Sequence, residues 1–218
     1  VLDKTRYNRK AWQLRTTQTM NVGLISLSTD ITIEKDFHRH CNHDVFTTRI
    51  IFENPITKKS LSALAGQVED AKTRFPMQMD KYVFGCTSGT AVIGEDNLPG
   101  LMNPLTSADN WLKDNGKKEL SLLTAYTEDI SSIIKHWFEQ KGYRIVNHKF
   151  LNYSNDIEIG RINQNELKKQ VLEFDPGCDT VFSSCTALPI IDMLGDLNEE
   201  TGIDYISSNW TMLWEINV

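Results

Sequence analysis

The chain has 218 residues, of which 40% are hydrophobic and 24% charged, and its formal net charge is −6 at pH 7. This composition is typical of a soluble globular protein, and the negative charge argues against a nucleic-acid-binding surface as the main function. No apolar stretch is long enough for a membrane span, and no segment resembles a secretory signal. We therefore expect a cytoplasmic protein with neither a nucleic-acid nor a membrane partner.

Residues 1–20 form a basic segment that differs from the rest of the chain. Its cations, set against Asp3 alone, are Lys4, Arg6, Arg9, Lys10 and Arg15. Such a segment is typical of a solvated arm or of an extension that grips a partner. We expect this arm to precede two lobes, residues 21–104 and 105–218, between which strands or helices can be exchanged.

Buried strands and helices alternate along the chain. We expect strands at residues 22–27, 45–52, 81–85, 120–124, 143–146 and 181–182. We expect helices over residues 61–75, 128–141, 167–172 and 189–202. Strands that are buried on both faces and alternate with helices predict an α/β fold with mainly parallel sheets.

The two halves of the chain look duplicated. Residues 24–29 lie 98 positions before residues 122–127, and Cys86 lies 99 positions before Cys185. We interpret the repeat as two flavodoxin-like lobes that face each other. The turns after their strands would then line one crevice, which is where open α/β sheets bind ligands.

The matched cysteines, Cys86 and Cys185, each follow a short apolar run and precede small residues that suit a turn into a helix. Near a helix N-terminus, free N–H groups and the helix dipole favour the thiolate. Two thiols can remove a proton from one side of a carbon acid and return it from the other, whereas one thiol can add to a double bond. Neither route needs a metal or an organic cofactor. The alternative is that both cysteines are small hydrophobic residues that fill strand ends.

The sequence alone does not decide the roles of several other polar residues. Residues 38–43 hold four potential metal ligands, but structural zinc sites use wider ligand spacing, so we expect no metal and interpret the stretch as a polar helix end. Tyr126, at a strand end, either contacts a substrate or packs at the rim of the crevice. Asp30 and Asp156 are turn acids, which usually cap helices and bind ligands only if they lie in a cleft.

Seven short segments, in a fixed order, carry a resemblance to a known family. They are Gly23–Ile25, Ser28–Asp30, Cys86–Ser88, Thr124–Tyr126, Asn155–Arg161, Ser184–Thr186 and Ser207–Asn209. Together they make the sequence resemble the Asp/Glu racemase superfamily, in the branch of maleate isomerases, arylmalonate decarboxylases and ectoine-utilisation proteins. The resemblance implies two pseudo-symmetric lobes, a cofactor-independent active site between them and a homo-oligomer, dimer or tetramer.

By the same resemblance, Cys86 and Cys185 are the paired cysteines and Tyr126 lines the pocket. Arylmalonate decarboxylases keep only the second cysteine, so the presence of both points to isomerisation or racemisation. Maleate isomerases carry Asn where this chain has Asp30 and Asp156. Carboxylates there would repel a dicarboxylate and suit a substrate with N–H groups or a cation. The ectoine-utilisation proteins resemble this chain more closely at both positions, and we therefore favour that branch.

We therefore expect a racemase or isomerase that acts on a small carboxylate, nitrogen-containing ones included, with Cys86 and Cys185 as paired acid and base. Backbone N–H groups are expected to hold the substrate carboxylate at Thr87, Ser88, Thr186 and Ala187. Side chains expected to orient the ligand are Asp30, Tyr126, Asp156 and Asn209. The alternatives are a maleate-type cis–trans isomerase, an arylmalonate-type decarboxylase and a binding protein that has lost the chemistry.

Overall fold

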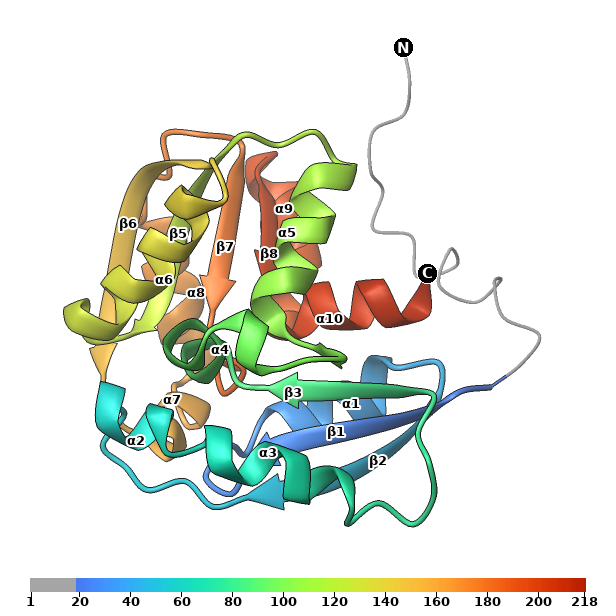
Figure 1. Ribbon diagram of the computed structural model, residues 1–218. Coiled ribbons are helices and arrows are strands. Elements are labelled where there is room, and N and C mark those ends of the chain that lie inside the picture. The colour runs from blue at the N-terminus through green and yellow to red at the C-terminus, as the bar shows by residue number, and fades with distance from the viewer. Residues whose placement is uncertain (1–18) are drawn as a thin grey trace.

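The structure is a computed structural model that describes residues 19–218, so nearly all of the basic arm predicted over residues 1–20 lies outside the described residues. The chain forms two four-stranded parallel sheets flanked by helices, one sheet in each lobe (Figure 1). The strand order is β2-β1-β3-β4 in the first sheet and β6-β5-β7-β8 in the second. The two orders are equivalent, as the sequence repeat predicts.

The first lobe contains the elements that lead to Cys86. Its strands are β1 (Asn21–Leu27), β2 (Asp44–Ile50), β3 (Lys81–Gly85) and β4 (Leu101–Met102). Its helices are α1 (Ile33–His40), α2 (Lys58–Ser62), α3 (Ala65–Lys72), α4 (Thr87–Ile93) and the short 3₁₀ helix η2 (Glu95–Asn97). The predicted strand over residues 81–85 is confirmed to the residue.

The second lobe contains the elements that lead to Cys185. Its strands are β5 (Glu119–Tyr126), β6 (Arg144–Tyr153), β7 (Thr180–Ser184) and β8 (Asp204–Ser207). The helices in this part of the chain are α5 (Pro104–Asp114), α6 (Glu128–Gln140), α7 (Asp156–Gly160), α8 (Gln164–Leu172), η3 (Ile191–Met193), α9 (Leu194–Thr201) and α10 (Ser208–Asn217). None of the helices within residues 19–218 combines the length and hydrophobicity that crossing a bilayer requires.

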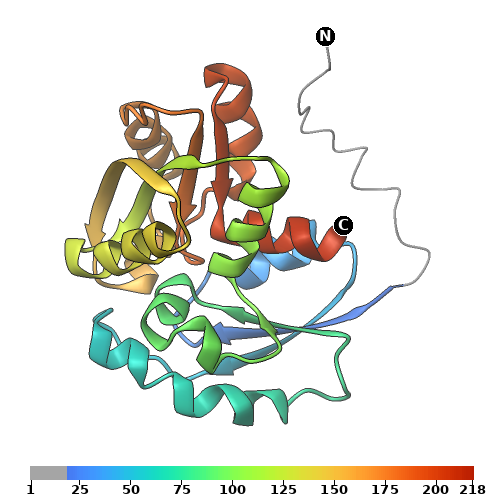
Figure 2. The same cartoon turned by 45° about the horizontal axis from the view of Figure 1, so that its top comes forward.

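The central strands explain why the repeat brings the two cysteines into equivalent places. In each sheet the first strand of the repeat, β1 or β5, pairs with the strand that ends at a cysteine, β3 or β7. A single cluster of buried apolar side chains runs through both lobes. Helix α10 packs against α5 and also reaches α1 of the first lobe, as Figure 2 shows. The lobes therefore share a packed interface.

Two predicted helices are wrong in extent. The helix expected over residues 61–75 is divided into α2 and α3 by a tighter turn, in which Leu64 N–H donates to Leu61 O at 3.1 Å. Leu64 lies at this turn and is fully buried, so the apolar residues still face the core although the helix is interrupted. The helix expected from Pro189 begins only with η3 at Ile191 and continues as α9 from Leu194.

Candidate active site

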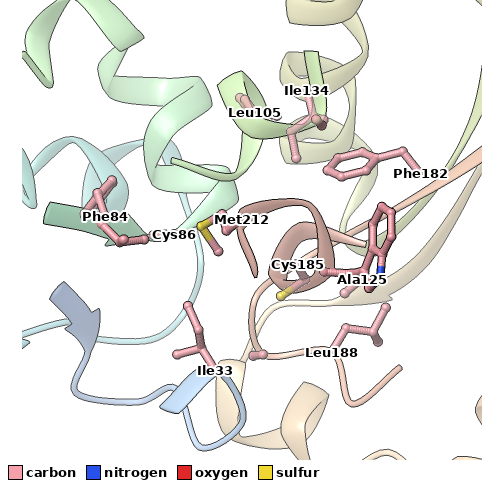
Figure 3. Packing of buried hydrophobic residues seen from close by; sticks show 14 of the residues in the cluster. Ile33, Phe84, Cys86, Leu105, Ala125, Ile134, Phe182, Cys185, Leu188 and Met212 are labelled. Atoms are coloured by element: carbon pink, nitrogen blue, oxygen red, sulfur yellow. The ribbon is translucent and has the colours of Figure 1, made fainter. Parts of the chain in front are cut away.

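Both cysteines lie directly after strands, at the boundary between the lobes. Cys86 is the N-cap of α4, and its sulfur accepts a hydrogen bond from Gly89 N–H at 3.2 Å. Cys185 follows β7, and the N–H group of Ala187 lowers the pKa of its thiol, against the effect of burial. Figure 3 shows Cys86 and Cys185 on segments of the chain that come from different lobes.

Polar side chains connect the two sulfur atoms. Ser88 Oγ lies 3.7 Å from Cys86 Sγ and close enough to the Tyr126 hydroxyl to lower the pKa of that hydroxyl. The Tyr126 hydroxyl in turn lies close enough to Cys185 to lower the pKa of its thiol, against the effect of burial. The structure therefore brings together Cys86, Ser88, Tyr126 and Cys185, four of the residues that the sequence analysis singled out.

The expectation that the helix N-terminus favours thiolates is wrong for the site as it stands. Burial, together with the nearby Asp156 carboxyl, raises the pKa of Cys86 to about 12, although the Gly89 N–H opposes both effects. Burial also raises the pKa of Cys185 well above its ordinary value. Each cysteine is 2% exposed, so the loss of hydration outweighs the few donors that face each sulfur.

The two predicted turn acids lie on opposite sides of the lobe boundary. Asp30 Oδ1 accepts hydrogen bonds from Thr32 N–H at 2.8 Å and Ile33 N–H at 3.0 Å, so this residue does cap the start of α1. Asp156 begins α7 and accepts a hydrogen bond from Thr29 Oγ1 at 2.8 Å. Burial raises the pKa of both carboxyl groups, that of Asp156 to about 7, and each lies close enough to both cysteines to raise their pKa.

Asn209 is buried, and both N–H groups of its side chain are already in use. Its Nδ2 donates to Asp36 Oδ2 and to Thr186 O, both at 2.8 Å. Its Oδ1 has no hydrogen-bond partner among the described residues, so the amide can only accept a hydrogen bond from a ligand. Asp36 was missed by the sequence analysis, and burial raises the pKa of its carboxyl group to about 7.

The remaining predicted residues make contacts between the lobes. Thr186 Oγ1 donates to Gly85 O at 3.3 Å, and Thr87 Oγ1 donates to Ser208 Oγ at 2.8 Å. Ala187 O accepts a hydrogen bond from Thr32 Oγ1 at 2.8 Å. All ten predicted site residues are at most 5% exposed, so the structure has a closed site that must open to admit a ligand.

A separate open cavity of about 600 Å³ lies beside α1. It is lined by Ile31, Glu34, Lys35, His38, Arg39 and Arg49, and none of the predicted site residues is among them. In the stretch 38–43, His40 contacts Asp192 at 3.0 Å at the surface end of α1, as the interpretation of a polar helix end predicts. Across residues 19–218, no group of three or more His, Cys, Asp or Glu side chains is arranged to hold a metal ion.

Comparison with known proteins places the chain in a family. The model of the arylmalonate decarboxylase family matches residues 98–218. The chain belongs to that family. A maleate isomerase from Alcaligenes faecalis is 25% identical over 104 residues, which make up 46% of this chain and 41% of that protein. The match therefore spans less than half of the curated relative.

Solved structures of the family share the two-lobed fold. A cysteine-to-serine variant of the maleate cis-trans isomerase of Nocardia farcinica, with a covalently bound succinylcysteine intermediate, aligns with a TM-score of 0.81 over 91% of each chain at 16% identity. A cysteine-to-alanine variant of the Pseudomonas putida maleate isomerase with maleate gives 0.77 over 91% of each chain at 14% identity. A liganded double variant of arylmalonate decarboxylase gives 0.76 over 91% of each chain at 16% identity. The family match thus confirms the expected branch and these structures confirm the expected fold, while the closer likeness to ectoine-utilisation proteins stays a prediction.

The raised pKa values of the thiols make a prediction about alkylation by iodoacetamide. Only the thiolate reacts, so the rates at Cys86 and Cys185 should still be increasing above about pH 9, while the half-buried Cys178 serves as the internal reference. Peptide mass spectrometry of samples quenched over time gives each rate separately. A plateau below about pH 8 at either buried cysteine would instead support the original thiolate interpretation.

Proposed function

We propose that this protein is a cofactor-independent enzyme that isomerises a small unsaturated dicarboxylate, of the maleate type, by cysteine chemistry. The observation that supports the proposal most strongly is the connection of Cys86 to Cys185 through Ser88 and Tyr126. Membership of the arylmalonate decarboxylase family and the fold shared with maleate isomerases agree with it.

The proposed reaction starts from neutral thiols. Cys86 Sγ forms a bond to one alkene carbon, and the other alkene carbon takes a proton from Cys185. The proton that Cys86 loses passes through Ser88 and Tyr126 to Cys185 and restores its thiol. The net change is the addition of the Cys86 S–H group across the double bond. Rotation about the resulting single bond, followed by the reverse steps, releases the trans isomer. We assign the addition to Cys86 because this residue is the N-cap of α4, so that the helix N-terminus and Gly89 N–H face its sulfur and stabilise developing negative charge, whereas Cys185 is followed by a turn.

Burial removes the objection that a carboxyl group at position 156 repels a dicarboxylate. Because the pKa of Asp156 is raised to about 7, this group retains its proton in a substantial fraction of molecules at neutral pH. A protonated carboxyl group donates a hydrogen bond from O–H, much as an Asn side chain donates from N–H. Protonated Asp156 can therefore lie beside a substrate carboxylate without electrostatic repulsion.

A second candidate function is proton removal and return at a carbon that bears an N–H group. The orientation of Asn209 favours it, because the side chain of this residue offers only an acceptor oxygen to a ligand. Turnover in heavy water separates the two functions. The second would incorporate solvent deuterium at the substrate α-carbon and leave the configuration of an added alkene unchanged.

Replacing either cysteine by serine should lower the rate of fumarate formation from maleate by about 10³-fold, because each thiol performs one half of the addition. Proton NMR of the reaction mixture follows both acids directly. In Cys185→Ser the proton that Cys86 loses can still reach the second alkene carbon through Ser88 and Tyr126, but no second thiolate remains to remove it, so the peptide that contains Cys86 should gain the mass of one maleic acid molecule. The matched control, Cys178→Ser, should keep the rate of the wild type. Full activity of Cys86→Ser or of Cys185→Ser would contradict the two-thiol mechanism.

The pH dependence of the same reaction tests the role of Asp156. Below about pH 7 the carboxyl group is protonated and can donate to the substrate, and above it the charged form repels the substrate. The value of kcat/KM for maleate should therefore fall by about tenfold per pH unit above the pKa. Asp156→Asn should remove this fall and keep the activity. A parallel decline in the wild type and in Asp156→Asn would assign the titration to another group.

A further inference from the structure

Ser208 lies between the two cysteine turns, yet the sequence analysis gave it no role. It is the first residue of α10 and is fully buried. Its Oγ accepts a hydrogen bond from the backbone N–H of Cys185 at 3.1 Å and another from Thr87 Oγ1 at 2.8 Å. Since Thr87 follows Cys86, one hydroxyl group connects the turn of the first cysteine to the backbone of the second.

The backbone at Cys185 is unusual. Its φ angle is 155°, in a region that residues with a side chain rarely adopt, whereas the equivalent Cys86 has an ordinary φ of −152°. A residue in such a conformation is strained and stays there only when its surroundings hold it. The hydrogen bond from Cys185 N–H to Ser208 acts directly on this backbone. The strained geometry of Cys185 thus depends on a side chain whose other partner belongs to the first lobe.

We propose that Ser208 is a positioning residue that, together with the Thr87 hydroxyl, holds Cys185 in the orientation in which its sulfur meets Tyr126. The inference rests on the proposed function only in the claim that this orientation serves turnover. The hydrogen bonds and the backbone angle of Cys185 stand independently of it. The arrangement makes the second cysteine dependent on the turn of the first, so the two thiols are aligned together.

The test compares the rates at which methyl methanethiosulfonate modifies Cys185 and Cys86 in the absence of substrate. A buried thiol reacts only when its segment opens locally, and losing one hydrogen bond makes opening easier. Ser208→Ala should therefore raise the rate at Cys185 by about 5- to 30-fold and leave the rate at Cys86 within about twofold. Thr87→Val should act in the same direction, whereas Thr87→Ser, which keeps the hydroxyl group, should match the wild type.

Ser107→Ala is the matched control, since Ser107 is equally buried but its hydroxyl has no hydrogen-bond partner among the described residues. With maleate as the probe substrate, Ser208→Ala should lower kcat by about 10- to 100-fold and change KM by less than about threefold. If Ser208→Ala does not fold, Thr87→Val with its Thr87→Ser rescue decides the question.

An unchanged Cys185 modification rate in folded Ser208→Ala and Thr87→Val, or an equal increase in Ser107→Ala, would overturn the proposal. So would unchanged kcat in variants whose Cys185 rate has risen. If the wild type does not convert maleate, the proposed function fails for that substrate. The modification rates still decide in that case whether Ser208 holds the second cysteine.

Discussion

Hydrogen bonds that cross from one lobe to the other hold the candidate active site together. Thr186 Oγ1 reaches Gly85 O at 3.3 Å, and Thr32 Oγ1 reaches Ala187 O at 2.8 Å. Both bonds are buried, and a buried polar group without a partner costs about 1–3 kcal/mol. Separation of the lobes would break both hydrogen bonds and leave their donors and acceptors without protein partners. The turns that carry the two cysteines are therefore kept facing each other by contacts next to the cysteines themselves.

The same burial decides the charge state of the site. It raises the pKa of Cys86 to about 12 and that of Asp156 to about 7, so the closed site holds neutral thiols and at least one partly protonated carboxyl group. Such a site suits chemistry in which protons pass between neighbouring neutral groups. Ser88 and Tyr126, which lie between the sulfur atoms, supply the hydroxyl groups that this transfer needs.

Much of this arrangement could be predicted because buried parallel strands are continuous apolar runs, and because a repeat places equivalent turns in equivalent positions. That reasoning found β3, β7 and the pairing of Cys86 with Cys185. It could not find the pKa of either thiol, which depends on how completely the opposite lobe covers the sulfur. Helix α10 was missed because most of its residues are buried, which leaves no polar face to reveal its period. Asp36 was missed because its partner Asn209 is 173 positions away.

The central claim is that the sulfur atoms of Cys86 and Cys185 share one site. Phenylarsine oxide, which binds tightly only where two thiols lie close together, tests this without any assumption about the substrate. Native mass spectrometry should detect one arsenical per chain in the wild type and in Cys178→Ser, and none in Cys86→Ser or in Cys185→Ser. Equal binding by the wild type and both of these single variants would contradict a shared site, as would binding by the unfolded chain alone.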